Sequence, residues 1–306
     1  MDDDPTPRRP AWQGMAAGAI GAVAGLAPWL ATGARLPLQN LWASTVLPDA
    51  MPFALLPVSQ YDVLTVLALL ATGAVAAAIA AAWLRLPRWA TAVGLAVVHV
   101  VALAQAFSVA AEGLEVGSTA DSRVVLYFGA MLAAAVMSAV LAQIAFRLVT
   151  SPSAATRAVG IALVALPVSS WCALWMRVAF GPGSIPGGLL AVMPWIPAVL
   201  IGVALGWCGF RPAPRVVVWA VALALLWVLP ALTTAFASAT GMRVLGDDVA
   251  EMADYGLAVF PLALLRVPAW PVLGALLIGL VVWATRVVLR TRAAERNPLP
   301  ATARRP

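Results

Sequence analysis

Four carboxylates fall within eight consecutive positions in the stretch VLGDDVAEMADYG, residues 244–256. They are Asp247, Asp248, Glu251 and Asp254, in a chain of which only 10% of the residues are charged. Clustered carboxylates suit a divalent cation, but their spacing matches no EF-hand loop. On a helix they share one face, and Asp248 with Glu251 has the spacing of a capping-box variant. The pattern favours a short solvated helix near 247–256, capped by Asp247 or Asp248, with functional carboxylates as the alternative.

The only histidine, His99, lies in the apolar run GLAVVHVVALAQAF. An ionisable side chain within a membrane span is a functional candidate by default. No carboxylate falls near the centre of any apolar run, so a proton relay through His99 would lack a second group. We therefore interpret His99 as a neutral structural imidazole that donates to a carbonyl or hydroxyl of a neighbouring helix, with a functional role as the alternative.

Other reactive residue types are sparse. Cys172 and Cys208 both lie in apolar runs, and no Cys-x-x-Cys pair occurs, so no zinc site is predicted. We expect the two cysteines near opposite membrane faces, too far apart for a disulfide. No phosphate-binding loop and no nucleophile elbow occurs, and no cofactor is predicted. Asp49 is the remaining loop carboxylate that we consider a functional candidate.

The composition places these residues in a membrane protein. Hydrophobic residues make up 63% of 306, and the mean hydropathy is +0.94. A soluble domain is about half apolar, with about a quarter of its residues charged. A soluble fold of this length could not bury so much apolar surface, so the surplus must face lipid.

The net charge of +6 does not indicate a nucleic-acid partner, because the basic residues form short clusters between apolar runs rather than one face. All 19 basic residues are arginine. Together with the excess of alanine and valine, this is typical of GC-rich coding and indicates a bacterial source.

Eight apolar runs are long enough to cross a bilayer, whose ~30 Å core requires about 20 helical residues. Helix is the expected state, because an isolated strand cannot satisfy its backbone in lipid. We predict an all-α bundle forming one transmembrane domain over 1–306, with a basic, disordered cytoplasmic tail at 291–306. The predicted spans are 13–33, 62–84, 91–110, 124–146, 158–176, 192–210, 216–238 and 270–290.

Arginine placement predicts the orientation. Fourteen arginines fall at the N-terminus, in three short turns and in the C-terminal tail, all on one side of the predicted bundle. Five fall on the other side: Arg35, Arg123, Arg177, Arg243 and Arg266. The positive-inside rule therefore predicts a cytoplasmic-membrane protein with both termini in the cytoplasm.

The two long outer segments, 34–61 and 239–269, are unusually apolar for loops. Each is interrupted by proline and contains aromatic residues, and neither has an uninterrupted run long enough to span. We expect them to form an outer cap of short interfacial helices or re-entrant pieces packed on protein.

Three function classes fit this pattern. The first is a permease-like protein that moves a small or lipidic solute through a proline-kinked bundle. The second is a non-catalytic membrane subunit or assembly factor, in which other membrane subunits or a second copy are the partners besides the lipid bilayer. The third is an outward-facing enzyme that acts on a lipid-linked substrate with loop carboxylates. The lack of recognisable catalytic motifs argues against an enzyme, and we favour the permease-like interpretation over the subunit.

Overall fold

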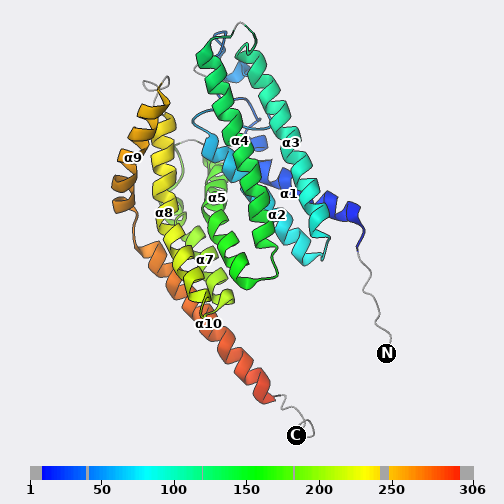
Figure 1. Ribbon diagram of the computed structural model, residues 1–306, viewed down its shortest axis with the longest axis vertical. Coiled ribbons are helices and arrows are strands. Elements are labelled where there is room, and N and C mark those ends of the chain that lie inside the picture. Colours follow the sequence, from blue (N-terminus) through cyan, green and yellow to red (C-terminus); the bar gives the residue numbers. More distant parts are fainter. Residues whose placement is uncertain (1–8, 39–40, 119, 182, 242–247, 297–306) are drawn as a thin grey trace.

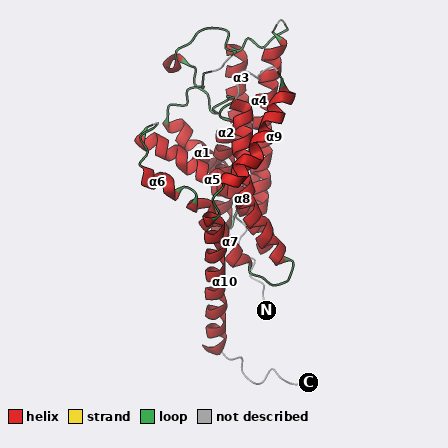
Figure 2. Ribbon diagram, turned by 90° about the vertical axis from the view of Figure 1, so that its left-hand side faces the viewer, coloured by secondary structure: helices red, strands yellow, loops and turns green. Residues whose placement is uncertain are grey.

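The computed structural model describes residues 9–38, 41–118, 120–181, 183–241 and 248–296. These residues form an all-α bundle, and Figure 2 draws only helices and loops for them. The helices are α1 (Ala11–Ala31), α2 (Val63–Trp83), α3 (Arg88–Gly113), α4 (Ser122–Val149), α5 (Ala154–Phe180), α6 (Gly187–Val192), α7 (Trp195–Cys208), α8 (Arg215–Gly241), α9 (Val249–Arg266) and α10 (Trp270–Arg296) (Figure 1).

Eight helical segments in the described part of the chain are long and apolar enough to cross a membrane. Seven of them are single helices, namely α1, α2, α3, α4, α5, α8 and α10. The eighth is a broken span over Gly187–Cys208, formed by α6 and α7 together. Each of the eight overlaps one of the spans predicted from the sequence. The protein is therefore a multi-pass membrane helix bundle.

One end of the bundle gathers the short connections and most of the described arginines. The turns that join α2 to α3, α4 to α5 and α7 to α8 lie there, and α10 continues beyond its neighbours at the same end (Figure 1). Arg85, Arg88, Arg147, Arg157 and Arg211 are in or beside these turns. We call this the arginine-rich end.

The bundle contains two packed cores that meet at α5. The first core joins α1 to α4 with the segment 34–61, and the second joins α5, α7, α8 and α10. α5 contacts α1, α2 and α4 on one side and α7 and α8 on the other. Trp171 of α5 donates from Nε1 to the carbonyl oxygen of Gly25 in α1 at 2.8 Å. The two halves are therefore joined by side-chain bonding as well as by packing.

The segment 34–61 packs on the first core at the end opposite the arginines, as expected of a protein-packed cap. Met51, Ala54 and Leu56 are buried, and the one described helical turn is Pro48–Ala50. Gln105 of α3 accepts from the Leu55 backbone N–H at 2.7 Å, and its amide nitrogen donates to the Phe53 carbonyl oxygen at 3.1 Å. Side-chain amides thus satisfy backbone groups of an irregular segment that lies against apolar surface.

The span formed by α6 and α7 is interrupted between Val192 and Trp195. The Ser169 hydroxyl, near the middle of α5, donates to the Met193 carbonyl oxygen at this break, at 2.9 Å. Pro194 follows, and proline supplies no backbone N–H to continue a helix. α7 consequently starts about half-way across the bundle.

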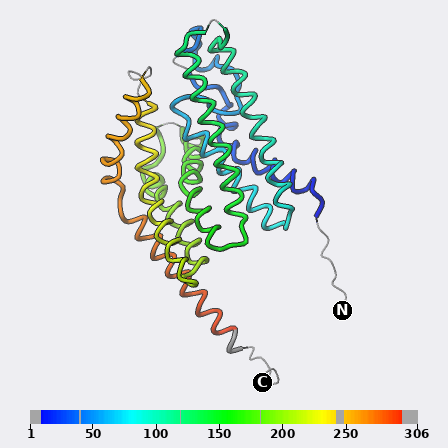
Figure 3. Tube along the Cα trace, in the orientation of Figure 1, coloured from blue at the N-terminus to red at the C-terminus, as the bar shows by residue number. Residues whose placement is uncertain are grey.

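The second long segment differs from the prediction. Its helix, α9, has 18 residues rather than the short stretch near 247–256. It runs back along α8, where Gly256 lies against Ala235 and Ala239 (Figure 3). A piece packed on protein was predicted, but the helix is longer than predicted because residues 257–266 are apolar enough to continue it along α8.

Candidate functional site

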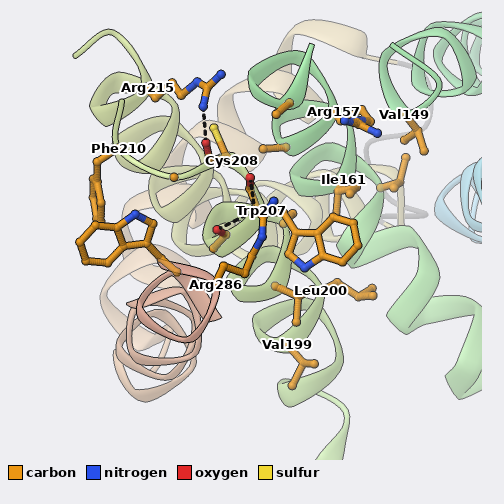
Figure 4. A pocket seen from close by; sticks show the side chains of 18 of the residues that line it. Val149, Arg157, Ile161, Val199, Leu200, Trp207, Cys208, Phe210, Arg215 and Arg286 are labelled. Carbon is orange, nitrogen blue, oxygen red and sulfur yellow. Dashed lines mark hydrogen bonds between the residues drawn. The ribbon is translucent and has the colours of Figure 1, made fainter. Parts of the chain in front are cut away.

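A cavity of about 1240 Å³ opens at the arginine-rich end, between α5, α7 and α10, with part of α2 at one side (Figure 4). Its walls are largely aliphatic. Ile161, Val164 and Val168 of α5 face Val199 and Val203 of α7 across it. Such a surface binds hydrocarbon rather than a hydrated solute.

The depth of this cavity corresponds to one bilayer leaflet. Its lining extends along α5 from Ala154 to Val168, and the part from Arg157 inward, eleven positions, is ~16 Å long at the rise of an α-helix. The hydrocarbon core of a bilayer is ~30 Å thick. The cavity therefore reaches from the arginine-rich face to about the middle of the membrane.

The mouth of the cavity is cationic. Five arginines line it, namely Arg157, Arg211, Arg215, Arg286 and Arg290. No Asp or Glu is among the lining residues in the part of the chain that the structure describes. A cleft with charge of one sign and low-dielectric walls concentrates counter-ions, so this mouth attracts anions.

Two of these arginines are fixed by the C-terminal end of α7 (Figure 4). Arg215 donates from Nη1 to the Cys208 carbonyl oxygen at 2.7 Å. Arg286 donates from Nη1 to the carbonyl oxygens of Trp207 at 2.6 Å and Gly206 at 3.3 Å. The last carbonyls of a helix lack partners in the helix and carry its negative partial charge, so a guanidinium is favourable there. These two arginines position the cavity mouth.

The other three arginines are available to a ligand. Arg157, Arg211 and Arg290 are exposed, and no hydrogen bond or ion pair joins their side chains to other described residues. They come from α5, from the turn before α8 and from α10. Each guanidinium offers five N–H donors in a planar fork that matches phosphate or carboxylate oxygens.

Aromatic side chains surround the same mouth. Trp207 is 62% exposed, and the Arg286 guanidinium lies 5.3 Å from its ring centroid. Phe210 stacks on Trp219 at 4.3 Å and meets the edge of Trp283 at 5.2 Å. Tryptophan favours the head-group level of a bilayer. The mouth therefore has the composition of a membrane interface, with hydrocarbon-binding walls beneath it.

The arrangement of these arginines in the sequence indicated the orientation of the bundle, but their convergence at one mouth was not predicted. A signal was present in the spacing of Arg286 and Arg290, which are four positions apart within α10, whereas Arg211 precedes α8 and Arg215 begins it. On a helix, residues four apart share a face. Both pairs also border apolar runs, which places them at an interface.

A second polar group lies at the opposite end and was also missed. Asp62, immediately before α2, accepts a hydrogen bond from the Thr65 hydroxyl at 3.3 Å. Burial raises the pKa of the Asp62 carboxyl above its usual value, while the Thr65 hydrogen bond and the charge of Arg177 act in the opposite direction. Asp62 was taken for the first residue of a span, so its half-buried position was not expected.

His99 is buried in α3, at 2% exposure, but its expected hydrogen bond is absent. Neither ring nitrogen has a partner among the described residues. The interpretation of His99 as a hydrogen-bond donor to a neighbouring helix was therefore wrong.

This environment makes a prediction for His99. Because both nitrogens are buried without partners, His99→Leu removes a desolvation cost of about 1–3 kcal/mol at similar volume. We expect the Leu variant to unfold at the same or a higher temperature than the wild type in detergent. His99→Gln keeps the unsatisfied polar group and serves as the control. A Leu variant that unfolds at a clearly lower temperature would show that His99 has a bonding role in the folded chain.

The candidate carboxylates that the structure describes do not form one metal-binding group. Asp248 caps α9, where its Oδ1 accepts from the backbone N–H groups of Ala250 at 2.9 Å and Glu251 at 3.0 Å, which confirms the predicted cap. Glu251 and Asp254 are exposed on the same helix. Asp49 is exposed in the separate turn Pro48–Ala50. No group of three or more metal-ligating residues occurs among the described residues, and Asp247 lies outside them.

Cys172 and Cys208 are free thiols in the structure, as predicted. Cys172 is partly exposed on α5, and Cys208 is buried at the end of α7 beside the cavity.

The fold and this cavity define the class of protein, a multi-pass α-helical membrane protein with a lateral, cation-lined apolar cavity. Comparisons of the chain with protein-family models, with curated proteins and with solved structures give no match. The function is therefore inferred from the site.

Proposed function

We propose that this is a permease-like protein that takes up an anionic amphiphile from the leaflet at its arginine-rich end. The ligand has a phosphate or carboxylate head group and at least one hydrocarbon chain. The observation that carries the proposal is the cavity itself, with aliphatic walls one leaflet deep below a mouth of five arginines. Its volume of about 1240 Å³ exceeds the ~300–1,000 Å³ of typical small-molecule sites, which suits a lipid.

The charge of the lining favours an anionic solute over a cation. No described carboxylate lines the cavity, so a cation would meet only repulsion. The three unbonded arginines, Arg157, Arg211 and Arg290, would hold the head group, and the walls of α5 and α7 would hold the chain. By the positive-inside rule, this leaflet is the cytoplasmic leaflet of the cell membrane.

Prolines beside the inner part of the cavity support movement of the ligand rather than storage. A small void lies between α5, α7 and α8 and is lined by Pro197 of α7 and Pro230 of α8. Pro167 of α5 lies within the same helix turn as Leu166, which also lines this void. Proline removes a helix hydrogen bond and permits bending. Bending at these points would widen the inner part of the cavity toward α8.

Binding by the purified protein tests the first step. Spin-labelled phosphatidylglycerol and phosphatidylcholine are compared in vesicles that contain the protein, and the motionally restricted fraction of each lipid is measured. We expect a restricted component that strongly prefers phosphatidylglycerol. Equal restriction of the two lipids would contradict an anion-selective cavity.

The orientation makes a separate prediction. Reporter fusions at residues 120 and 245 are expected to read out as external, and a fusion at residue 152 as cytoplasmic, because the arginine-rich end should face the cytoplasm. An internal readout at 120 or 245 would reverse the leaflet that supplies the ligand.

A membrane subunit that works through helix contacts remains the second candidate function. The observation in its favour is α9, which is apolar over much of its length but packs on α8 alone among the recorded helix contacts.

A further inference from the structure

The flank formed by α9 is open. None of the residues of α9 is buried, and Leu257, Leu262 and Leu265 are 71%, 63% and 84% exposed. The helix that it packs against is α8. α9 therefore presents most of its circumference away from the bundle, and this surface is separate from the arginine-lined cavity.

The contact of α9 with α8 places Arg266, the last residue of α9, nearer the middle of the bundle than the outer loop assigned from the sequence. Trp227 of α8 donates from Nε1 to the Leu264 carbonyl oxygen at 3.3 Å. Trp227 is twelve residues beyond Arg215 at the cavity mouth, which is ~18 Å along the helix. The hydrocarbon core is ~30 Å thick, so Leu264 and the adjacent turn that holds Arg266 lie near its middle.

At this depth the charge of Arg266 requires compensation. Its side chain is exposed, and no ion pair joins it to a carboxylate in the described part of the chain. Arginines within membranes almost always face a protein interior or an aqueous cavity and pair with another group. Lipid chains around α9 offer neither. The charge indicates that another molecule covers this flank.

We infer that α9 docks a transmembrane helix of a different protein, and that this helix carries an Asp or Glu near its centre, paired with Arg266. A second copy of this chain does not supply that group. None of its 13 acidic residues lies in the middle of a span, because all are in terminal or connecting segments, at the end of α3 or in the first two turns of α9. Charge complementarity therefore selects a heteromeric partner.

The inference is tested with the full chain in phosphatidylcholine vesicles. The probe is a labelled synthetic helix of about 22 Leu and Ala residues, long enough to span, with Asp at its centre. Energy transfer from the labelled protein reports association. We expect the Asp-centred helix to associate at least ~10-fold more tightly than the same helix with Leu at the centre. Arg266→Leu should remove this preference, and Arg123→Leu, at the end opposite the arginines, should not.

A charge exchange separates loss of the contact from loss of the fold. The Arg266→Glu variant should no longer bind the Asp-centred helix and should instead bind the same helix with Lys at its centre. The isolated Arg266→Leu chain should also unfold at a higher temperature than the wild type, because an uncompensated charge is removed. Equal binding of the Asp-centred and Leu-centred helices would overturn the inference, as would lower thermal stability of Arg266→Leu. Association between two labelled copies that depends on Arg266 would overturn it in favour of a homo-oligomer.

Discussion

Replacing Gly94 by alanine should prevent α1 and α3 from packing and should remove most of the folded protein. A Cβ at this position would lie closer than 3.0 Å to the Met15 carbonyl oxygen, carbonyl carbon and Cα. A Cβ at Gly18 would meet the Thr91 carbonyl oxygen in the same interface. These neighbours are backbone atoms, which no side-chain rotation can move. The two helices would have to separate.

The expected size of this effect follows from the packing of the first core. Inserting atoms into a well-packed core costs about 1–3 kcal/mol, and more when backbone must shift. α1 and α3 form the most extensive helix pair of the bundle, so we expect the upper end of that range or more. The measurement is the amount of monodisperse protein and its unfolding temperature in detergent.

Gly129 of α4 provides the matched control. A Cβ there meets nothing within 4 Å, and the residue is exposed toward lipid. Alanine is favoured over glycine inside a helix by ~1 kcal/mol, so Gly129→Ala should be as stable as the wild type or more stable. If Gly94→Ala were as stable as Gly129→Ala, the close contact between α1 and α3 would be contradicted.

Removing the three unbonded arginines should abolish selective binding of the anionic lipid. In the variant Arg157→Gln, Arg211→Gln, Arg290→Gln, each lost charge weakens attraction to an anionic head group by ~1 kcal/mol. The sum of ~3 kcal/mol corresponds to about 100-fold in affinity. Arg215 and Arg286 are retained because they bond the end of α7. The measurement is the affinity for phosphatidylglycerol, relative to phosphatidylcholine, in vesicles.

The control variant also replaces three arginines at the same face, so its change in net charge equals that of the first triple variant. Arg85, Arg88 and Arg147 belong to the arginine-rich end but do not line the cavity. The variant Arg85→Gln, Arg88→Gln, Arg147→Gln should retain most of the binding preference. If both triple variants lost binding equally, general surface charge rather than the cavity would explain the preference.

The spans could be predicted from the sequence because lipid imposes a simple condition on length and polarity. The cap at Asp248 could also be predicted, because an N-cap depends on residues within one turn. The cavity could not, since it depends on how α7 and α10 pack against α5. Arg286 and Arg157 are 129 positions apart, and nothing local to either indicates that they share a mouth.

The course of α9 and the surroundings of His99 also could not be predicted from the sequence, because both depend on tertiary packing. Residues 257–266 are short for a span and were assigned to the outer cap, although in the fold they follow α8 into the membrane. For His99, a buried imidazole was expected to be bonded, because most buried polar groups are. Whether a partner comes within reach of its ring nitrogens is set by tertiary packing.

Movement of lipid between leaflets tests the central claim most directly. Fluorescent phosphatidylglycerol is placed in both leaflets of vesicles with and without the protein, and a membrane-impermeant quencher reports how fast lipid from the inner leaflet reaches the outer one. The account predicts faster exchange of phosphatidylglycerol than of phosphatidylcholine in the presence of the protein. Val203→Trp, which fills the cavity between α7 and α5, should slow this exchange toward the rate of protein-free vesicles. Exchange that is no faster than in protein-free vesicles, or that Val203→Trp leaves unchanged, would contradict the proposed lipid pathway.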